Sequence, residues 1–278
     1  MTRMASILAL LSAVLWGSSD FEGGRLSKRY PAISVLGSTQ LISLIFGFAL
    51  VIAVGETELT SKVFFAGAAA GLFGYLGLIC LYAGLSTGKM GVVSPISSLS
   101  VLIPMSVALI GGETMSTLTA IGCALAIIGG FLTSGPEFSK GISIKPLLLA
   151  VGAALGFGSA LTFLAIGAAE APILTMVCMR VATAFVTIGI AIKKRGFGGL
   201  GKANLPSLIF IGVADFAANA TLGLAVNIGP VAVSMVLGAL YPVFTVLLAF
   251  FILHERLHKA QYIGGIAAVA GVALISAF

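Results

Sequence analysis

Charged residues are scarce in this chain. Asp, Glu, Lys and Arg make up only 9% of its 278 residues. The hydrophobic types Ala, Val, Ile, Leu, Met, Phe, Trp, Tyr and Cys make up 59%. Soluble domains carry about 25% charged and roughly 45–50% apolar residues, and the mean hydropathy here is +1.17. Because so few charges cannot cover a water-soluble surface, the composition excludes a soluble enzyme, a nucleic-acid-binding module and a disordered protein.

Cysteine and histidine are also rare, with three and two residues in the whole chain. Cys80, Cys123 and Cys178 stand inside apolar runs, so we expect neither a disulfide framework nor a cysteine metal site. The sequence has no P-loop and no G-x-S-x-G motif. We therefore expect no cofactor and no bound metal, and the missing ATP-binding motif argues against a primary pump.

Long apolar runs dominate the chain instead. A helix needs about 20 apolar residues to cross a bilayer, and runs of that order recur throughout. Asn227-Ile228-Gly229-Pro230 divides a run that is too long for one helix, because Gly and Pro favour turns. The sequence therefore predicts an all-α integral membrane protein with ten transmembrane helices. The ten spans are 4–20, 32–54, 63–86, 91–111, 117–134, 146–168, 172–192, 205–226, 230–253 and 260–277.

The two halves of the sequence repeat one another at an offset of 141–142 residues. Gly17 aligns with Gly158 at the first offset, and Glu113 aligns with Glu255 at the second. Each half holds five spans, and because five is odd the second half must enter the membrane upside down. The prediction is therefore two inverted five-helix repeats. Their boundaries are residues 1–138 and residues 139–278.

Basic residues gather on one side of the predicted membrane. Twelve Lys and Arg fall in loops on that side, against Arg3 and Lys62 on the other. The positive-inside rule then places the chain in the inner membrane with both termini outside the cytoplasm. The twelve are Arg25, Lys28, Arg29, Lys89, Lys140, Lys145, Lys193, Lys194, Arg195, Lys202, Arg256 and Lys259.

Proline and glycine mark breaks and close contacts inside the spans. Pro95 and Pro104 lie in the fourth span and Pro242 lies in its repeat partner, the ninth, where they can kink helices and free carbonyl groups. Inverted repeats with broken helices in equivalent positions are typical of secondary transporters. We expect a structural role for these prolines and a site between the two spans. The G-x-x-x-G spacing of Gly152 and Gly156 favours close helix packing.

Several of these residues also carry a resemblance to a known family. Trp16-Gly17-Ser18-Ser19 resembles the opening of an EamA repeat, and so does Pro242 followed by Glu255 and Gly264, although Ser100 stands where the first repeat usually has proline. Over nearly its whole length the chain resembles two-repeat members of the drug/metabolite transporter superfamily. The resemblance implies a ten-helix bundle with a central cavity that transports amino acids, other metabolites or toxic compounds, often outward.

Asp215 and Arg180 are charges in the middle of predicted spans. A charge near the bilayer centre costs about 2.5 kcal/mol or more, so an intramembrane acid suggests function. Asp215 could bind a substrate cation or carry a proton, and Asn219 one turn later shares its face. Arg180 could hold a substrate carboxylate, or the two charges could form a structural pair. The equivalent positions in the first half, near Thr39 and Gly74, are uncharged.

A second set of polar and aromatic side chains could line a wet cavity. Aromatic rings with a polar tip suit such a wall, although Trp16 would also fit the interfacial belt of a membrane protein. With Asp215 and Asn219, the predicted substrate-binding residues are Trp16, Ser19, Tyr75, Tyr82, Ser94, Ser97, Ser98 and Tyr241.

Four further acids have simple structural explanations. Asp20 and Glu22 end the first span beside Arg25, where they could form local ion pairs or serve proton coupling. Glu113 and Glu255 lie at turns between spans, where an acid can cap the free N–H groups of a helix start.

His254-Glu255-Arg256-Leu257-His258 matches the H-E-x-x-H signature of zinc proteases. The motif falls at a short turn, and no other histidine is available as a ligand. The favoured function is a secondary transporter that moves a small amino acid-like or drug-like metabolite by alternating access, with export expected. A lipid flippase or scaffold and an intramembrane metallohydrolase are the alternatives. The expected partners are a solute, the bilayer and a coupling proton, with no nucleic acid, and the chain could be a monomer or a homodimer.

Overall fold

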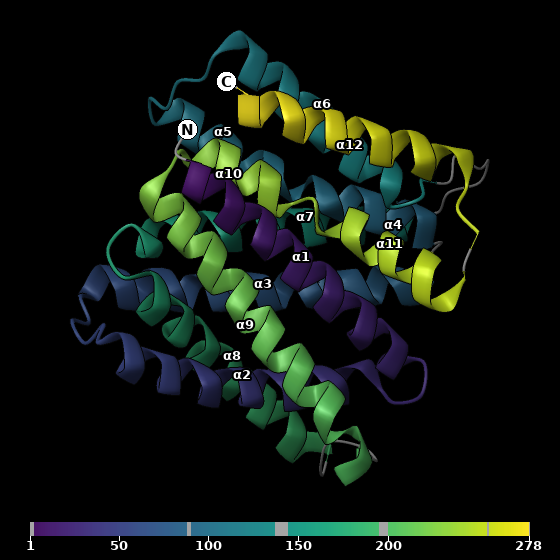
Figure 1. Cartoon of the computed structure of the whole chain (residues 1–278). Helices are drawn as coiled ribbons and strands as arrows, with labels where there is room; N and C mark the ends of the chain where they lie inside the picture. Colours follow the sequence, from purple (N-terminus) through teal and green to yellow (C-terminus); the bar gives the residue numbers. More distant parts are fainter. Residues whose placement is uncertain (1–2, 88–89, 137–143, 195–199, 255, 278) are drawn as a thin grey trace.

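The computed structural model describes residues 3–87, 90–136, 144–194, 200–254 and 256–277, and every regular element within them is a helix (Figure 1). The all-α prediction is therefore confirmed. Six long helices each cross the bundle in one piece. They are α1 (Arg3–Ser27), α2 (Ala32–Val54), α3 (Ser61–Thr87), α7 (Ile144–Ala168), α8 (Pro172–Lys194) and α9 (Leu205–Ile228).

The fourth and ninth spans are each broken near their middle. The fourth consists of α4 (Met90–Ser98), the 3₁₀ turn η1 (Leu99–Val101) and α5 (Leu102–Ile110), and the ninth of α10 (Val231–Gly238) and α11 (Tyr241–Leu253). The bundle is completed by α6 (Thr117–Thr133) and α12 (Lys259–Ala277). Within the described residues, eight segments are long and apolar enough to cross a membrane, and the two shorter apolar ones match the fourth and fifth predicted spans.

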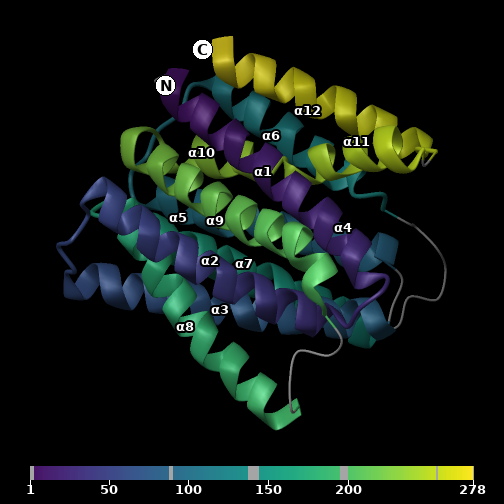
Figure 2. The same ribbon diagram turned by 60° about the horizontal axis from the view of Figure 1, so that its bottom comes forward.

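The two halves interleave. The main helix pairs all join one half to the other: α3 packs along α7, α1 along α9, α6 along α12 and α2 along α8. If each helix is replaced by its equivalent in the other half, α3–α7 becomes α9–α1, whereas the pairs α6–α12 and α2–α8 stay the same. This is the relation that an inverted repeat requires. Figure 1 shows α6 and α12 together at the top and α2 and α8 at the bottom, and Figure 2 shows α6 and α12 still adjacent after rotation.

Two equivalent glycines show this symmetry at atomic level. A Cβ on Gly17 would lie 2.7 Å from the carbonyl oxygen of Tyr241, and a Cβ on Gly158 would lie 2.6 Å from that of Ser100. Both pairs are separated by the same repeat offset, since Gly158 follows Gly17 by 141 residues and Tyr241 follows Ser100 by 141. Each glycine thus lets α1 or α7 touch the main chain where the opposite half's span is broken.

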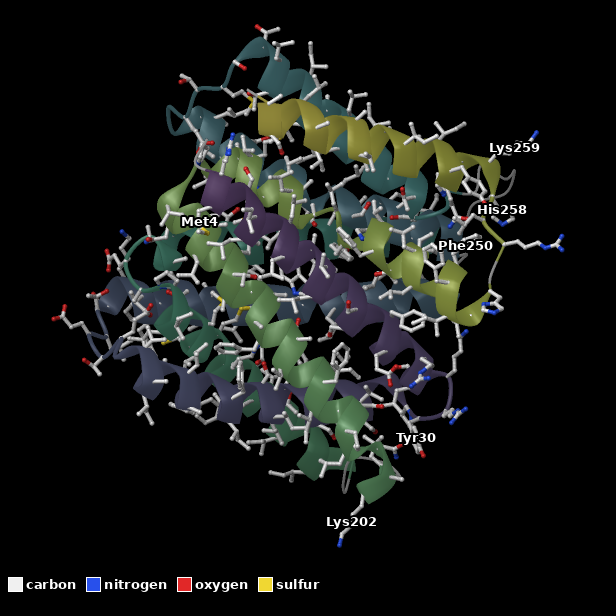
Figure 3. The ribbon with its side chains drawn as sticks, in the orientation of Figure 1. Met4, Tyr30, Lys202, Phe250, His258 and Lys259 are labelled. Atoms are coloured by element: carbon white, nitrogen blue, oxygen red, sulfur yellow. The ribbon has the colours of Figure 1, made fainter. Side chains whose placement is uncertain are left out.

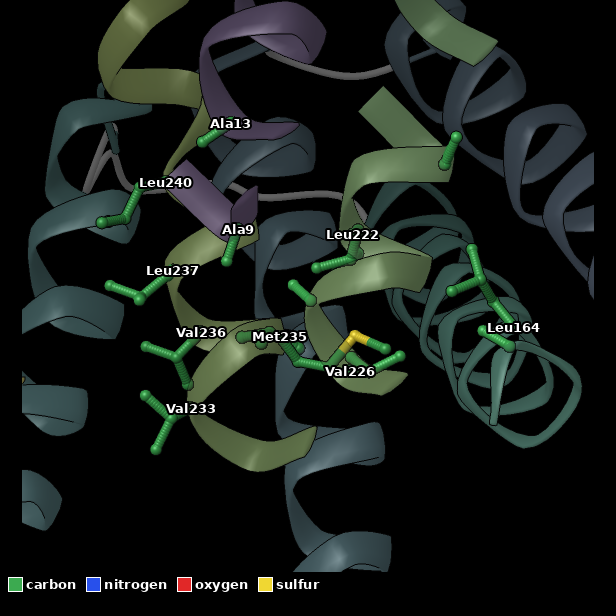
Figure 4. Packing of buried hydrophobic residues seen from close by; sticks show 14 of the residues in the cluster. Ala9, Ala13, Leu164, Leu222, Val226, Val233, Met235, Val236, Leu237 and Leu240 are labelled. Atoms are coloured by element: carbon green, nitrogen blue, oxygen red, sulfur yellow. The ribbon is translucent and has the colours of Figure 1, made fainter. Parts of the chain in front are cut away.

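Small and branched residues fill the centre of the bundle. Ala9 and Ala13 of α1 pack with Leu222 of α9 and with Met235 and Leu237 of α10, and all five are fully buried (Figure 4). The outer surface is apolar as well. It carries exposed side chains such as Ile52, Phe65 and Ile110, which is the pattern of a lipid-facing surface.

Both termini lie at the same end of the bundle (Figure 1). Figure 3 shows Met4 at that end, and Tyr30, Lys202 and Lys259 toward the opposite end. Lys202 and Lys259 therefore lie at the end opposite the termini, as the predicted separation of basic residues requires. Which end faces the cytoplasm stays a prediction. Lys89, Lys140 and Arg195 lie outside the described residues.

Candidate functional site

An intramembrane ion pair lies where α8 meets α9. Nη2 of Arg180 donates to Oδ2 of Asp215 at 2.6 Å. The Arg180 side chain is only 3% exposed, whereas that of Asp215 is 27% exposed. Pairing offsets the cost of placing either charge in an apolar interior. The structure therefore contains the Arg180–Asp215 pair, which the sequence analysis left as one of two possibilities. Within this pair, the carboxylate of Asp215 is the more accessible group.

Trp16 from the first half completes the surroundings of this carboxylate. Its indole Nε1 donates to Oδ1 of Asp215 at 3.2 Å, and its ring meets that of Tyr241 edge to face with centroids 6.2 Å apart. Asn219 Nδ2 donates to the main-chain oxygen of Asp215 at 2.8 Å. Four predicted site residues from α1, α9 and α11 therefore meet at one place. The Trp16 contact places this side chain inside the protein and not in an interfacial belt.

Gln40 belongs to the same network and was missed by the sequence analysis. Its Oε1 accepts from Nη1 of Arg180 at 2.9 Å and from the hydroxyl of Thr183 at 3.2 Å. The signal was available, because Gln40 is the one amide in the apolar span 32–54. Nε of Arg180 is buried and has no partner among the described residues. We call Trp16, Gln40, Arg180, Asp215 and Asn219 the central cluster.

Asp20 and Ser19 lie one turn beyond Trp16 on α1. Asp20 is exposed, and it follows Trp16 by four positions, on the same face of α1. Ser19 is buried, and its hydroxyl donates to the main-chain oxygen of Ile211 at 3.3 Å. Asp20 therefore adds a second accessible carboxylate beside the central cluster, whereas Ser19 ties α1 to α9.

Other candidate residues lie elsewhere. Tyr75 is half-buried on α3, and within the described part of the chain no hydrogen bond or ring contact joins it to the central cluster. Ser97 and Ser98 are buried at the break of the fourth span. The side chains of Tyr82 and Ser94 lie outside the described residues.

Glu22 forms a local ion pair near the end of α1. Its Oε2 lies 2.8 Å from Nε of Arg25, one turn later on the same helix. The local-pair reading fits this geometry better than proton coupling does. For Asp20, by contrast, no ion pair occurs within the described ranges.

Acidic turns of the first half cap helices of the second. The Glu113 carboxylate accepts from the main-chain N–H groups of Val231 at 2.8 Å and Ala232 at 2.9 Å, at the start of α10. Glu56 accepts from the N–H of Leu174 at 2.9 Å, in the first turn of α8. Capping was the expected role of Glu113, but the capped helix lies more than a hundred residues away. Glu255 lies outside the described residues.

The described residues of the H-E-x-x-H motif, His254 and 256–258, are not helical. α11 ends at Leu253, His254 adopts a left-handed conformation with φ of 55°, and α12 begins only at Lys259. The two histidines therefore do not share a helical face. Among the described residues, no three His, Cys, Asp or Glu side chains are grouped so that they could hold a metal ion.

Ten apolar helical spans around a buried, hydrogen-bonded ion pair define a multi-pass membrane protein. The sequence profile of the EamA-like transporter family matches residues 3–135 and 144–277. The chain therefore belongs to the EamA-like transporter family and has two EamA domains. The resemblance and the fold class expected from the sequence are both confirmed.

Two individual relatives give further context. A protein of Lactiplantibacillus plantarum (strain ATCC BAA-793 / NCIMB 8826 / WCFS1) named "Putative sugar uptake protein" is 31% identical over 160 residues, which is 52% of this chain and 55% of the relative. The chain thus matches about half the length of that curated relative. One crystal structure superposes with a TM-score of 0.80 at 18% identity and covers 98% of this chain and 97% of the other. At that identity the likeness supports the fold alone.

Proposed function

We propose that the chain is a secondary transporter that carries a small organic metabolite across the inner membrane by alternating access, with the solute bound at Trp16, Asp215 and Tyr241. The central cluster is the observation that carries this proposal. Its residues come from both halves, so a relative movement of the halves would rearrange the site. The side chain of Asp215, which offers an acceptor, and that of Trp16, which offers a donor, remain partly accessible.

Arg180 serves to position Asp215 in this proposal. Its guanidinium is almost fully buried and donates to both Asp215 and Gln40. Because this guanidinium is almost fully buried and already paired with Asp215, a direct role in binding an amino acid carboxylate loses support. The exposed carboxylate of Asp20 and the partly accessible carboxylate of Asp215 instead favour a solute that offers hydrogen-bond donors or a positive charge.

The aromatic rings narrow the chemistry further. The edge-to-face pair of Trp16 and Tyr241 presents apolar faces beside carboxylate and amide groups. Such a wall suits a drug-like or amino acid-like amine, and it also suits a sugar, whose hydroxyls donate to carboxylates while its C–H face packs on a ring. The name of the L. plantarum relative supports the sugar alternative. Export is the proposed direction, and uptake is the alternative.

A transport assay with one matched pair of variants tests the site. Purified protein would be reconstituted in vesicles and assayed for counterflow of labelled sugars, amino acids, polyamines and cationic dyes. Trp16→Phe keeps the ring but removes the donor to Asp215, so we expect transport to fall at least about tenfold. Tyr262→Phe removes a hydroxyl from an exposed site on α12 and should transport normally. A Trp16→Phe variant with wild-type transport would refute the assigned site, and vesicle lipid scrambling without solute counterflow would favour the flippase alternative.

The membrane orientation needs its own test. We propose that residues 1–138 and 139–278 are oppositely inserted halves and that both termini face away from the cytoplasm. The proposal rests on the basic residues at the end opposite the termini. An impermeant thiol reagent should label a cysteine added after Phe278 in intact cells, but not one placed at exposed Lys202. The reverse labelling pattern would overturn the orientation.

A further inference from the structure

The inner face of α1 changes from close packing to open space along the helix. Ala13 is fully buried on this face, and a Cβ on Gly17 would lie 2.7 Å from the carbonyl oxygen of Tyr241. Asp20 and Gly24 follow at spacings of three and four residues, so they lie on the same face. Both are nevertheless exposed, and a Cβ on Gly24 would meet no neighbouring atom within 4 Å. We call this open part of the inner face, at Asp20 and Gly24, the α1 opening.

The α1 opening lies within the bundle and not beyond its end. Leu26 follows Asp20 by six residues, is only 7% exposed, and packs in one apolar cluster with Leu208 of α9. α1 is therefore still packed against a neighbouring helix at the level where its inner face is open. The opening begins one turn after Trp16, beside the central cluster, and leads toward the end of the bundle where Figure 3 shows Tyr30.

The carboxylate of Asp20 brings a charge to this opening that has no partner within the described part of the chain. The nearby acids are both paired, Asp215 with Arg180 and Glu22 with Arg25, whereas Asp20 takes part in no ion pair. In the central cluster together with Asp20, two carboxylates and one guanidinium leave one negative charge in excess. An uncompensated charge is costly in an apolar bundle, so a bound solute with one positive charge would be stabilised there.

We propose that the solute is a monovalent organic cation, and that Asp20 binds its charge in the α1 opening while Trp16 and Tyr241 contact its apolar part. Aromatic faces attract organic cations as well as apolar groups, so the two rings suit such a solute. A sugar or a zwitterion would leave the excess negative charge in place. The inference rests on the proposed function, because it assigns the class of solute for the same site.

The fluorescence of Trp16 offers a direct test, because the chain has no other tryptophan. Purified full-length protein would be titrated at about pH 8, where an exposed carboxyl group is ionised. The probes are choline, the neutral alcohol in which carbon replaces its ammonium nitrogen, and glucose. We expect choline to change the fluorescence saturably, at a concentration at least about tenfold lower than either neutral probe requires. No saturable response to choline, or an equal response to a neutral probe, would overturn the proposal.

A matched pair of variants tests the assigned residue. Asp20→Asn removes the charge but keeps the shape of the side chain, so the half-saturating choline concentration should rise at least about tenfold. Glu22→Gln is the control, because it makes the same change of charge two residues later, at a carboxylate already paired with Arg25. It should bind choline like the wild type. Wild-type choline affinity of Asp20→Asn, or equal losses in both variants, would overturn the assignment.

The binding measurement is independent of transport, so the two proposals can fail separately. Choline binding that depends on Asp20, without counterflow of any cation in vesicles, would contradict the proposed transport but support the cation site. Counterflow of a labelled sugar without choline binding would support transport and overturn the cation site.

Discussion

The helix pair α1–α9 and the pair α3–α7 are equivalent in the inverted repeat but meet through different chemistry. In α3–α7 a Cβ on Gly156 would lie 2.5 Å from Cα of Gly77, so the two backbones are nearly in contact. The equivalent positions in α1–α9, offset by 141 residues, are Leu15 and Ala218. Neither position is a glycine, and the hydrogen bond from Trp16 to Asp215 crosses this second pair.

The comparison indicates that two equivalent helix pairs of one fold have different roles. The α3–α7 pair uses close packing of small residues and a stacked pair of rings, Phe73 and Phe163, 5.5 Å apart. The α1–α9 pair keeps polar groups whose burial costs stability and whose accessibility suits binding. Symmetry of the backbone thus does not require symmetry of the site.

The largest expected effect comes from removing the α8 partner of Asp215, the charge that α9 brings to the α1–α9 pair. Arg180→Ala would leave Asp215 without its cation inside the membrane and should lower stability by about 3–5 kcal/mol. Replacing both residues with Gln and Asn should recover much of this loss in a detergent melting experiment but should not restore transport. If the double variant were no more stable than Arg180→Ala, the loss of stability would not come from the unpaired charge of Asp215.

Glycine substitution in the other pair should have the next largest effect. Gly156→Ala would press a methyl group against the backbone of Gly77, with an expected loss of about 1–3 kcal/mol. Gly152→Ala is the matched control, because its added Cβ would meet only the Cys80 side chain, with Sγ at 3.1 Å. Equal melting temperatures for the two variants would mean that α3 and α7 separate easily.

Removal of a cap at the end of the bundle should cost less than either change. Glu113→Ala leaves the first two N–H groups of α10 without their acceptor, and we expect a loss of about 1–2 kcal/mol. Hydrogen exchange at Val231 and Ala232 should speed up, whereas exchange in α3 and α7 should not change. Unaltered exchange at α10 would contradict the capping role.

The smallest effect is expected from a change of pH. It acts on the interactions of Glu170, which lies outside both helix pairs. A hydrogen bond from the hydroxyl of Thr60 at 2.7 Å, and then the ammonium of Lys62 at 2.9 Å, hold the pKa of Glu170 below its ordinary value. A carboxyl group with a lowered pKa contributes stability above its unfolded pKa, and that contribution disappears as the pH falls through the folded one. Glu170→Gln should therefore slightly reduce the loss of melting temperature between about pH 6 and pH 3. A steeper loss in the variant would contradict this assignment.

Particular residues show how far sequence reasoning reached. It identified Asp215 and Arg180 as candidates because an intramembrane charge stands out against apolar runs. It identified Trp16 through the motif that resembles the opening of an EamA repeat. It missed Gln40, the one amide of its apolar span, which carries no charge and whose partner Arg180 lies 140 positions away. It also could not name the helix that Glu113 caps, since α10 begins 118 residues later.

The sequence by itself determined the spans, the broken helices and the repeat, because these depend on local properties: apolar length, the missing N–H of proline, and the match between halves. Only the tertiary structure decided which equivalent helix pair is packed by glycine and which is joined by the hydrogen bond from Trp16 to Asp215. That decision depends on contacts between residues such as Trp16 and Asp215, separated by 199 positions. Interleaving of the two halves brings these residues within hydrogen-bonding distance, and no local pattern in the sequence specifies that contact.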